Sequence, residues 1–322
     1  MNRLAAWLAA GALGAAGLAA AQTYPTKPVR IVSPYPTGIS PDVAARLVGE
    51  RLSKAWGQPV VVEPRPGANG FIAIGAAKKA APDGHELLLV GNAHLTINPH
   101  VFKDIPYDPE HDFVPVSLIY RAPFFIVVAA NGPYRTIHDL VAAAKANPER
   151  ITYSTPYVGS PPHLGGAMLA ALTGTKMQAV HFKEGPQIYT SVANGDVSFS
   201  VASAGSATPL IKAGRLKFLA IAAPERLASQ PDVPTIKEAG GPPEYEVESW
   251  VGFVAPRGTP PELARRIAAD VAAALADPEL RERYRNLGLE PVATSGAAMG
   301  ELIHTDLRRT GDIVKRAAIQ PE

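Results

Sequence analysis

The sequence contains no cysteine, and this absence excludes several classes of site. Without thiols the chain can form neither disulfides nor thiolate metal sites, and it has no cysteine nucleophile. Excess charge of one sign is also lacking, because 31 basic residues stand against 29 acidic ones. We therefore expect neither nucleic acid nor an anionic membrane as a partner. The 322 residues must gain their stability from a hydrophobic core, which a chain of this length can build.

Catalytic and cofactor motifs are missing as well. The sequence has no Gly-x-Ser-x-Gly elbow, no His-Glu-x-x-His, no histidines paired at metal spacing, and no glycine-rich phosphate or dinucleotide loop. We expect a protein without enzymatic activity, cofactor or metal. The enzymatic alternative, an α/β hydrolase, lacks a recognisable pair of nucleophile and base.

Residues 1–21 have the pattern of a secretory signal. A basic start at Arg3 precedes an apolar run rich in alanine and glycine, which ends in a small-residue cleavage pattern at Ala21. We expect cleavage near Ala21 and export to the periplasm, which leaves a mature chain of net charge +1. The alternative is a membrane anchor, although the run is near the lower limit for spanning a bilayer.

Short apolar runs alternate with amphipathic stretches along most of the chain. The runs are rich in Val, Ile and Phe and do not alternate strictly, as is typical of strands covered on both faces. This order predicts an α/β fold with mostly parallel sheets, and the length suits two domains. The predicted strands are residues 29–35, 59–64, 85–92, 113–120, 124–130, 151–155, 178–182, 197–203, 216–223 and 248–256.

Two strand-to-helix turns, at residues 33–42 and 154–163, share one pattern. Each passes through a glycine (Gly38, Gly159) to a serine (Ser40, Ser160) that we expect to cap the following helix, and proline comes next. Such a turn presents backbone N–H groups at the positive end of a helix dipole, where anions bind. Either turn alone could be merely a well-capped helix, but one in each half of the chain favours a shared anion-binding cleft.

The stretches YPTGISPDVAARLV, VEPRPGANGFIAIGAAKKAAPDGHELLLV, GSPPHLGG and SWVGFVAPRGTP carry a family resemblance. In this order they resemble the periplasmic receptors of tripartite tricarboxylate transporters, also called Bug receptors. The resemblance implies a type II-like periplasmic binding protein with two lobes, each a mostly parallel sheet flanked by helices, and a ligand cleft between them. The expected divisions are a signal peptide (1–21), lobe I (22–123), lobe II (124–223), and a crossover and C-terminal segment returning to lobe I (224–322).

The resemblance also implies a ligand, a partner and a set of contact residues. The ligand would be a small organic acid, an amino acid or an amide-bearing aromatic acid. A monomeric receptor would deliver it to the membrane permease; the alternative is a receptor that signals to a sensor kinase. The implied ligand-binding residues are Tyr35, Thr37, Gly38, Ile39, Ser40, Asp42, Asn92, His94, Thr96, Thr155, Tyr157, Gly159, Ser160, His163, Lys183, Glu184, Gly185 and Ser203.

Four of the family's usual residues are replaced in this chain. Ile39 stands where the family usually has a second glycine, Phe182 and Glu184 replace the tyrosine and glycine of a Tyr-Lys-Gly segment, and Ser198 replaces an aspartate. If Glu184 faces the cleft, it repels a second ligand carboxylate. This pattern favours a monocarboxylate, an amino acid or an amide-bearing acid over a tricarboxylate.

Several of these positions also have purely structural interpretations. Asp42 lies four residues before Arg46 and could form an i,i+4 ion pair. His163 could cap its own turn. Outside this set, Asn69 could point to the cleft or cap a helix, and we favour the cap. Trp250 could stack on the ligand, but packing in the core or at a hinge is the preferred interpretation.

Overall fold

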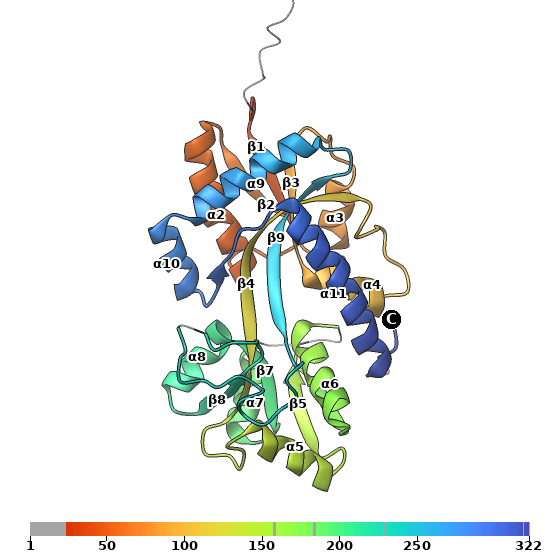
Figure 1. Cartoon of the computed structure of the whole chain (residues 1–322), viewed down its shortest axis with the longest axis vertical. Coiled ribbons are helices and arrows are strands. Elements are labelled where there is room, and N and C mark those ends of the chain that lie inside the picture. Colours follow the sequence, from red (N-terminus) through yellow and green to blue (C-terminus); the bar gives the residue numbers. More distant parts are fainter. Residues whose placement is uncertain (1–23, 157–158, 183–184, 228, 318, 322) are drawn as a thin grey trace, which may run out of the picture.

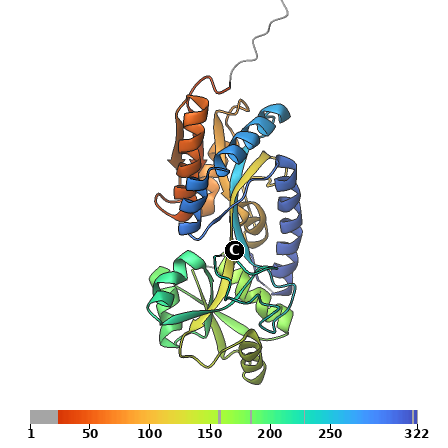
Figure 2. The same cartoon turned by 60° about the vertical axis from the view of Figure 1, so that its left-hand side comes forward.

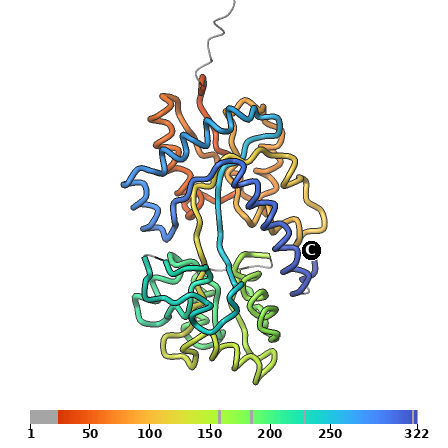
Figure 3. The backbone as a smooth tube through the Cα atoms, viewed as in Figure 1, coloured from red at the N-terminus to blue at the C-terminus, as the bar shows by residue number. Residues whose placement is uncertain are grey.

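The computed structural model describes residues 24–156, 159–182, 185–227, 229–317 and 319–321. The chain forms two halves, which two long antiparallel strands connect (Figure 1). These strands are β4 (Phe113–Ala129) and β9 (Glu248–Pro256), and the tube trace follows them side by side through the middle of the molecule (Figure 3). The expected two-lobed α/β class is confirmed.

Lobe I, the upper half in Figure 1, is built on three parallel strands in the order β2-β1-β3. Strand β9 pairs antiparallel with β3, and the first part of β4 pairs with β9. The elements of lobe I besides β4 and β9 are β1 (Val29–Ser33), α2 (Ser40–Trp56), β2 (Val60–Pro64), the 3₁₀ turn η1 (Ala68–Gly70), α3 (Phe71–Ala77), β3 (Glu86–Gly91), the π-helix η2 (Ala93–Ile97), α4 (Asn98–Val101), α9 (Pro261–Leu275), α10 (Pro278–Asn286), β10 (Glu290–Pro291) and α11 (Gly296–Arg316).

Helices cover both faces of the lobe I sheet, as the turned view shows (Figure 2). Ile31 of β1 packs with Leu47 of α2 on one face, whereas Val32 packs with Ile74 of α3 on the other. Both neighbouring positions of the strand are therefore fully buried. This arrangement explains why the strand sequences are apolar throughout instead of alternating.

Lobe II contains a second mostly parallel sheet, in which β5 pairs with β6 and β7. The last part of β4 joins this sheet antiparallel to β7 and β8. The remaining elements are α5 (Ile137–Ala146), β5 (Ile151–Thr155), α6 (Pro161–Thr173), β6 (Met177–His181), α7 (Gly185–Asn194), β7 (Phe199–Ser203), α8 (Ala204–Lys212) and β8 (Leu216–Ile221).

The chain passes between the lobes at two narrow junctions. On β4, Pro123 is paired with Glu248 in the sheet of lobe I, while the next residue, Phe124, is paired with Ser203 in the sheet of lobe II. On the return, the Val247 N–H donates to the carbonyl of Ala222 before Glu248 enters β9. We call these two junctions the hinge.

Residues before β9 belong to the core of lobe II. Ile236, Tyr245 and Val247 pack with Tyr153 and Phe199, so lobe II extends beyond residue 223. The subsequent return of the chain through α9, α10 and α11 adds helices to lobe I.

Helix α11 runs from lobe I along the side of the hinge towards α6 (Figure 1). Its Met299 and Ile303 are buried in the core of lobe I, whereas Val314 packs against Leu164 of α6. The fully buried Trp250 of β9 donates its indole N–H to Asp306 of this helix at 2.7 Å. Trp250 is thus a core residue beside the hinge, in agreement with the structural interpretation.

No helix among residues 24–321, apart from the few positions left undescribed, has the length and apolar composition needed to span a bilayer.

Replacing Asp306→Asn is predicted to stabilise the protein more at neutral pH than at acid pH. Burial raises the pKa of the Asp306 carboxyl above its ordinary value of 3.8. The folded state therefore binds more protons than the unfolded state above pH 3.8, and stability falls as the pH rises. Asparagine does not titrate and can still accept the indole N–H, so urea unfolding at pH 4 and pH 7.5 should show the gain mainly at pH 7.5.

The exposed Asp312→Asn on the same helix is the control, and it should show no comparable pH-dependent gain. A loss of stability in Asp306→Asn of the same size at both pH values would contradict this account.

Candidate ligand-binding site

A cavity of about 340 Å³ lies where the parallel strands of lobe I end. Residues of the segments 34–39, 66–70 and 93–102 form its walls, and these segments follow β1, β2 and β3 respectively. Gly159, which follows β5, contributes the wall from lobe II. Ligands of open α/β sheets bind at this carboxyl edge of the strands.

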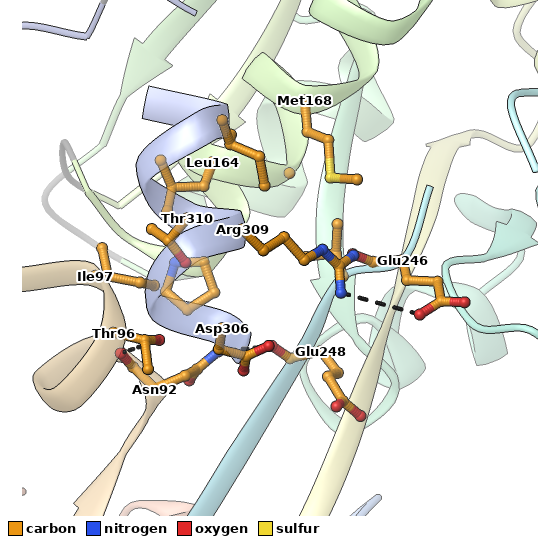
Figure 4. Close-up of a pocket in the computed structure, with 14 residues that line it drawn as sticks. Asn92, Thr96, Ile97, Leu164, Met168, Glu246, Glu248, Asp306, Arg309 and Thr310 are labelled. Atoms are coloured by element: carbon orange, nitrogen blue, oxygen red, sulfur yellow. Dashed lines mark hydrogen bonds and ion pairs between the residues drawn. The ribbon is translucent and has the colours of Figure 1, made fainter. Parts of the chain in front are cut away.

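A second cavity lies behind η2, beside the hinge (Figure 4). Its walls include Asn92, Thr96, Glu248, Asp306 and Arg309, but its volume is about 60 Å³. Small-molecule sites usually measure roughly 300–1,000 Å³, so this cavity has room only for water.

A larger hollow of about 630 Å³ lies beside Lys27, Arg30 and Glu86, at the amino ends of the strands. Because ligands of α/β sheets bind at the carboxyl ends, the cavity of 340 Å³ is the candidate site. We call it the interlobe cavity.

The interlobe cavity brings together four of the residues expected at the site: Tyr35, Ile39, His94 and Gly159. Asn92 and Thr96 face the small hinge cavity instead (Figure 4). The Asn92 amide donates to the carbonyl of Glu248 at 2.8 Å, and the Thr96 hydroxyl donates to the carbonyl of Asn92 at 3.0 Å. The π-helix η2 separates the two cavities, because it turns His94 to one side and Asn92 and Thr96 to the other.

In the first turn, the positive end of α2 is already neutralised by the chain itself. The residue that precedes the helix is Ile39, which makes no capping hydrogen bond, so the prediction that Ser40 caps α2 is wrong. Instead, the buried Asp42 accepts the Gly38 N–H at 2.9 Å and pairs with Arg46 at 3.0 Å. The expected i,i+4 ion pair is confirmed. Thr37 and Ser40 are exposed and do not line the cavity.

The second turn caps its helix as predicted. The Ser160 hydroxyl accepts the His163 N–H at 3.3 Å and lies 2.9 Å from the Thr155 hydroxyl. The Gly159 N–H donates to Nδ1 of His163 at 3.1 Å, so His163 caps its own turn. Burial lowers the pKa of His163 to about 4, and the ring is neutral at pH 7.

The first turn of α6 differs from that of α2, because it holds no acidic residue and its cap is the neutral Ser160. The helix begins with Pro161 and Pro162, which have no N–H, and the Gly159 and His163 N–H groups are bonded within the turn. Gly159 brings this end of the helix to the cavity wall.

His94 supplies a neutral donor to the cavity. Its side chain is only 6% exposed, and its Nδ1 accepts the Gly91 N–H at 3.4 Å, which leaves the proton on Nε2. Within the described part of the chain Nε2 has no hydrogen-bond partner. Burial lowers the pKa of His94 to about 4, so the ring carries no charge at pH 7. The ring of Tyr35 packs edge-on against it.

Gly185 begins α7. Ser203 ends β7 with its hydroxyl 2.8 Å from that of Ser206, and it does not line the cavity. Tyr157, Lys183 and Glu184 lie outside the described residues. Among the residues that the structure does describe, no cluster of His, Asp or Glu could hold a metal ion.

The loop that follows β2 also lines the cavity, and the sequence had suggested only Asn69 of this loop as a residue that could point to the cleft. Gly67, Asn69 and Gly70 line the cavity, and the carbonyl of Asn69 accepts the amide of Asn98 at 3.0 Å. Asn69 makes no capping bond, so its expected role as a helix cap is wrong. The two glycines within four residues were the available signal, since Gly67 and Gly70 both have positive φ. Phe102, at the end of α4, was also missed.

Comparisons with known proteins agree on one family. Residues 44–319 match the family described as tripartite tricarboxylate transporter family receptor. A UPF0065 protein of Bordetella bronchiseptica is 36% identical, over 94% of this chain and 89% of that protein.

Two solved structures extend the similarity to the fold. R. palustris Rpa4515 with adipate is 32% identical with a TM-score of 0.80, covering 93% of this chain and 100% of that one. MatC from Rhodopseudomonas palustris with bound malate is 28% identical with a TM-score of 0.75, covering 90% and 100%.

Gly70→Ala is predicted to destabilise the protein more than Gly38→Ala. Both glycines have left-handed backbones, with φ of +90° and +86°, so both variants incur a similar backbone cost of about 1–2 kcal/mol. A Cβ at Gly70 would also overlap Cδ2 of the buried His94 ring, whereas a Cβ at Gly38 meets nothing. This overlap should cost a further ~1–3 kcal/mol in urea unfolding. Equal losses in the two variants would show that the ring is not held against Gly70.

Proposed function

The chain belongs to the tripartite tricarboxylate transporter receptor family, and we propose that it captures a small carboxylate between its lobes and delivers it to the transporter's membrane permease. It is a solute-binding receptor and not an enzyme. The observation that carries the proposal is the interlobe cavity of about 340 Å³, which lies at the carboxyl ends of the strands and takes walls from both lobes.

The carboxylate would lie at the lobe II side of the cavity, beside Gly159. A partly buried helix terminus contributes up to ~2 kcal/mol to anion binding, and each charge-assisted hydrogen bond about 1.5–3 kcal/mol. A micromolar ligand requires about 8 kcal/mol. Two or three polar contacts, together with apolar contact to Ile39 and Phe102, reach this value.

Ligand binding would favour the closed arrangement of the lobes. Contacts to both lobes can form together only when the lobes approach, so a ligand shifts the population towards closure. The hinge confines this motion to two junctions, at Pro123–Phe124 and Val247–Glu248. Gly159 lies against Val101 of lobe I, where a Cβ would approach Val101 to 2.9 Å. Delivery would then require that the permease distinguishes the closed form from the open one.

The cellular setting follows from the same proposal. The segment 1–21 directs export, cleavage near Ala21 releases the mature chain into the periplasm, and the receptor acts as a monomer. The relatives with adipate and malate support a small organic acid as the ligand. An amino acid or an amide-bearing aromatic acid are the narrower ligand classes that the sequence suggested.

Ile39→Trp is predicted to weaken carboxylate binding at least tenfold. Ile39 is 42% exposed and lines the cavity, so an indole at this position would occupy ligand space without disturbing the core. A panel of small mono- and dicarboxylates, including adipate and malate, is first screened by thermal shift. Calorimetry then measures the affinity of the best ligand for the wild type and the variant.

Val61→Trp on β2 is the matched control, because Val61 is 50% exposed and does not line the cavity. It should bind like the wild type. The proposal fails if no acid in the panel stabilises the protein, or if Ile39→Trp binds the best ligand as tightly as Val61→Trp does.

A further inference from the structure

Three large apolar side chains are exposed among the described residues, and Ile39 is the one that lines the interlobe cavity. Its side chain is 42% exposed. Its backbone is held at the start of α2, where the Ile39 carbonyl accepts the Val43 N–H at 3.0 Å. A ligand in the cavity can cover this side chain, and the removal of apolar surface from water stabilises the complex.

Ile39 belongs to a largely apolar wall in lobe I. The same wall includes Pro34, Pro36, Pro66, Val101 and Phe102. The ring of Phe71 packs edge-on against Phe102 at 5.6 Å and against Tyr107 at 5.9 Å, so the aromatic part of the wall is held in place. The three prolines also provide no backbone N–H to a ligand. A ligand group on this side of the cavity therefore meets mainly carbon atoms.

Several polar groups in the surrounding loops are already bonded within the protein. The Gly70 N–H donates to the carbonyl of Gly67 at 3.0 Å. The Asn98 amide donates to the carbonyl of Asn69 at 3.0 Å and to the Tyr107 hydroxyl at 3.4 Å. A ligand hydroxyl placed against the apolar wall would exchange its hydrogen bonds to water for contact with carbon, which is unfavourable.

We propose that Ile39 determines specificity, because it selects acids whose carbon chain carries no hydroxyl groups over hydroxylated acids of the same length and charge. The chain of the acid lies against Ile39 and its apolar neighbours. The preference holds for acids with one carboxylate and for acids with two. This inference rests on the proposed function and narrows its substrate class.

Two pairs of six-carbon acids test the inference. Adipate and galactarate each have two carboxylates, whereas hexanoate and gluconate each have one. Galactarate and gluconate differ from their partners by the hydroxyl groups on the chain. In the pair that binds more tightly, calorimetric titration of the mature protein at pH 7.5 should show the acid without hydroxyl groups binding at least tenfold more tightly than its partner. One hydroxyl buried without a hydrogen bond is enough for this difference.

Ile39→Ala and Ile39→Leu separate the role of this side chain from that of the whole cavity. Alanine removes apolar contact, so the affinity for the acid without hydroxyl groups should fall at least fourfold, about the effect of one buried methylene. The affinity for its hydroxylated partner should change less than twofold. Leucine keeps the apolar volume and should keep the wild-type preference within twofold.

Val61→Ala is the control, because it truncates an exposed apolar side chain outside the cavity. It should leave both affinities unchanged. Neither Ile39 nor Val61 belongs to the buried core, so all three variants should fold, and thermal unfolding checks this.

Galactarate or gluconate binding as tightly as its partner would overturn the inference and leave the proposed carboxylate receptor intact. An equal loss of affinity for both acids of a pair in Ile39→Ala would also overturn it, as would another acid of the panel binding when neither adipate nor hexanoate does. If none of the four acids binds and the wider panel also gives no ligand, the proposed function itself is wrong.

Discussion

Ligand binding depends on the way both lobes end their parallel strands at one shared cavity. Loops after β1, β2 and β3 form its lobe I walls, and Gly159, just before α6, contributes from lobe II. The first turn of α6 holds no acid, whereas at α2 the buried Asp42 accepts the Gly38 N–H and pairs with Arg46. The apolar residues and the neutral His94 in the walls then limit what the ligand can be.

The fold links this position to movement of the lobes. Because the strands β1, β2, β3 and β5 all end at the cavity, ligand contacts come from loops on both sides of the hinge. Among the described residues, the chain crosses between the two sheets at β4 and at the junction before β9. Helix α11 reinforces the connection, since it is held to β9 by the Trp250–Asp306 hydrogen bond and touches α6 through Val314. Closure must therefore rearrange the contacts of α11 as well as the cavity.

Much of the fold could be predicted from the sequence, because the pattern of apolar residues within each short segment determines where a strand forms. All ten predicted apolar runs overlap strands, because strands that are covered on both faces require continuous apolar residues whether their neighbours are parallel or antiparallel. The runs at 113–120 and 124–130 proved to be a single strand, β4. The sequence could not indicate that the two runs are continuous, because Pro123 between them predicts the end of a strand.

The site was harder to predict. Ser40 fits the pattern of a cap as well as Ser160 does, and only the folded loop lets Asp42 reach the Gly38 N–H. Asn92 and Thr96 follow β3, as the sequence indicated, but the π-helix η2 directs their side chains to the small hinge cavity instead of the interlobe cavity. The crystal structure of a complex with a bound small carboxylic acid tests the central claim most directly. The ligand is predicted to lie in the interlobe cavity, between Gly159 of lobe II and the loop at residues 66–70 of lobe I, and a ligand bound at another cavity would contradict the claim.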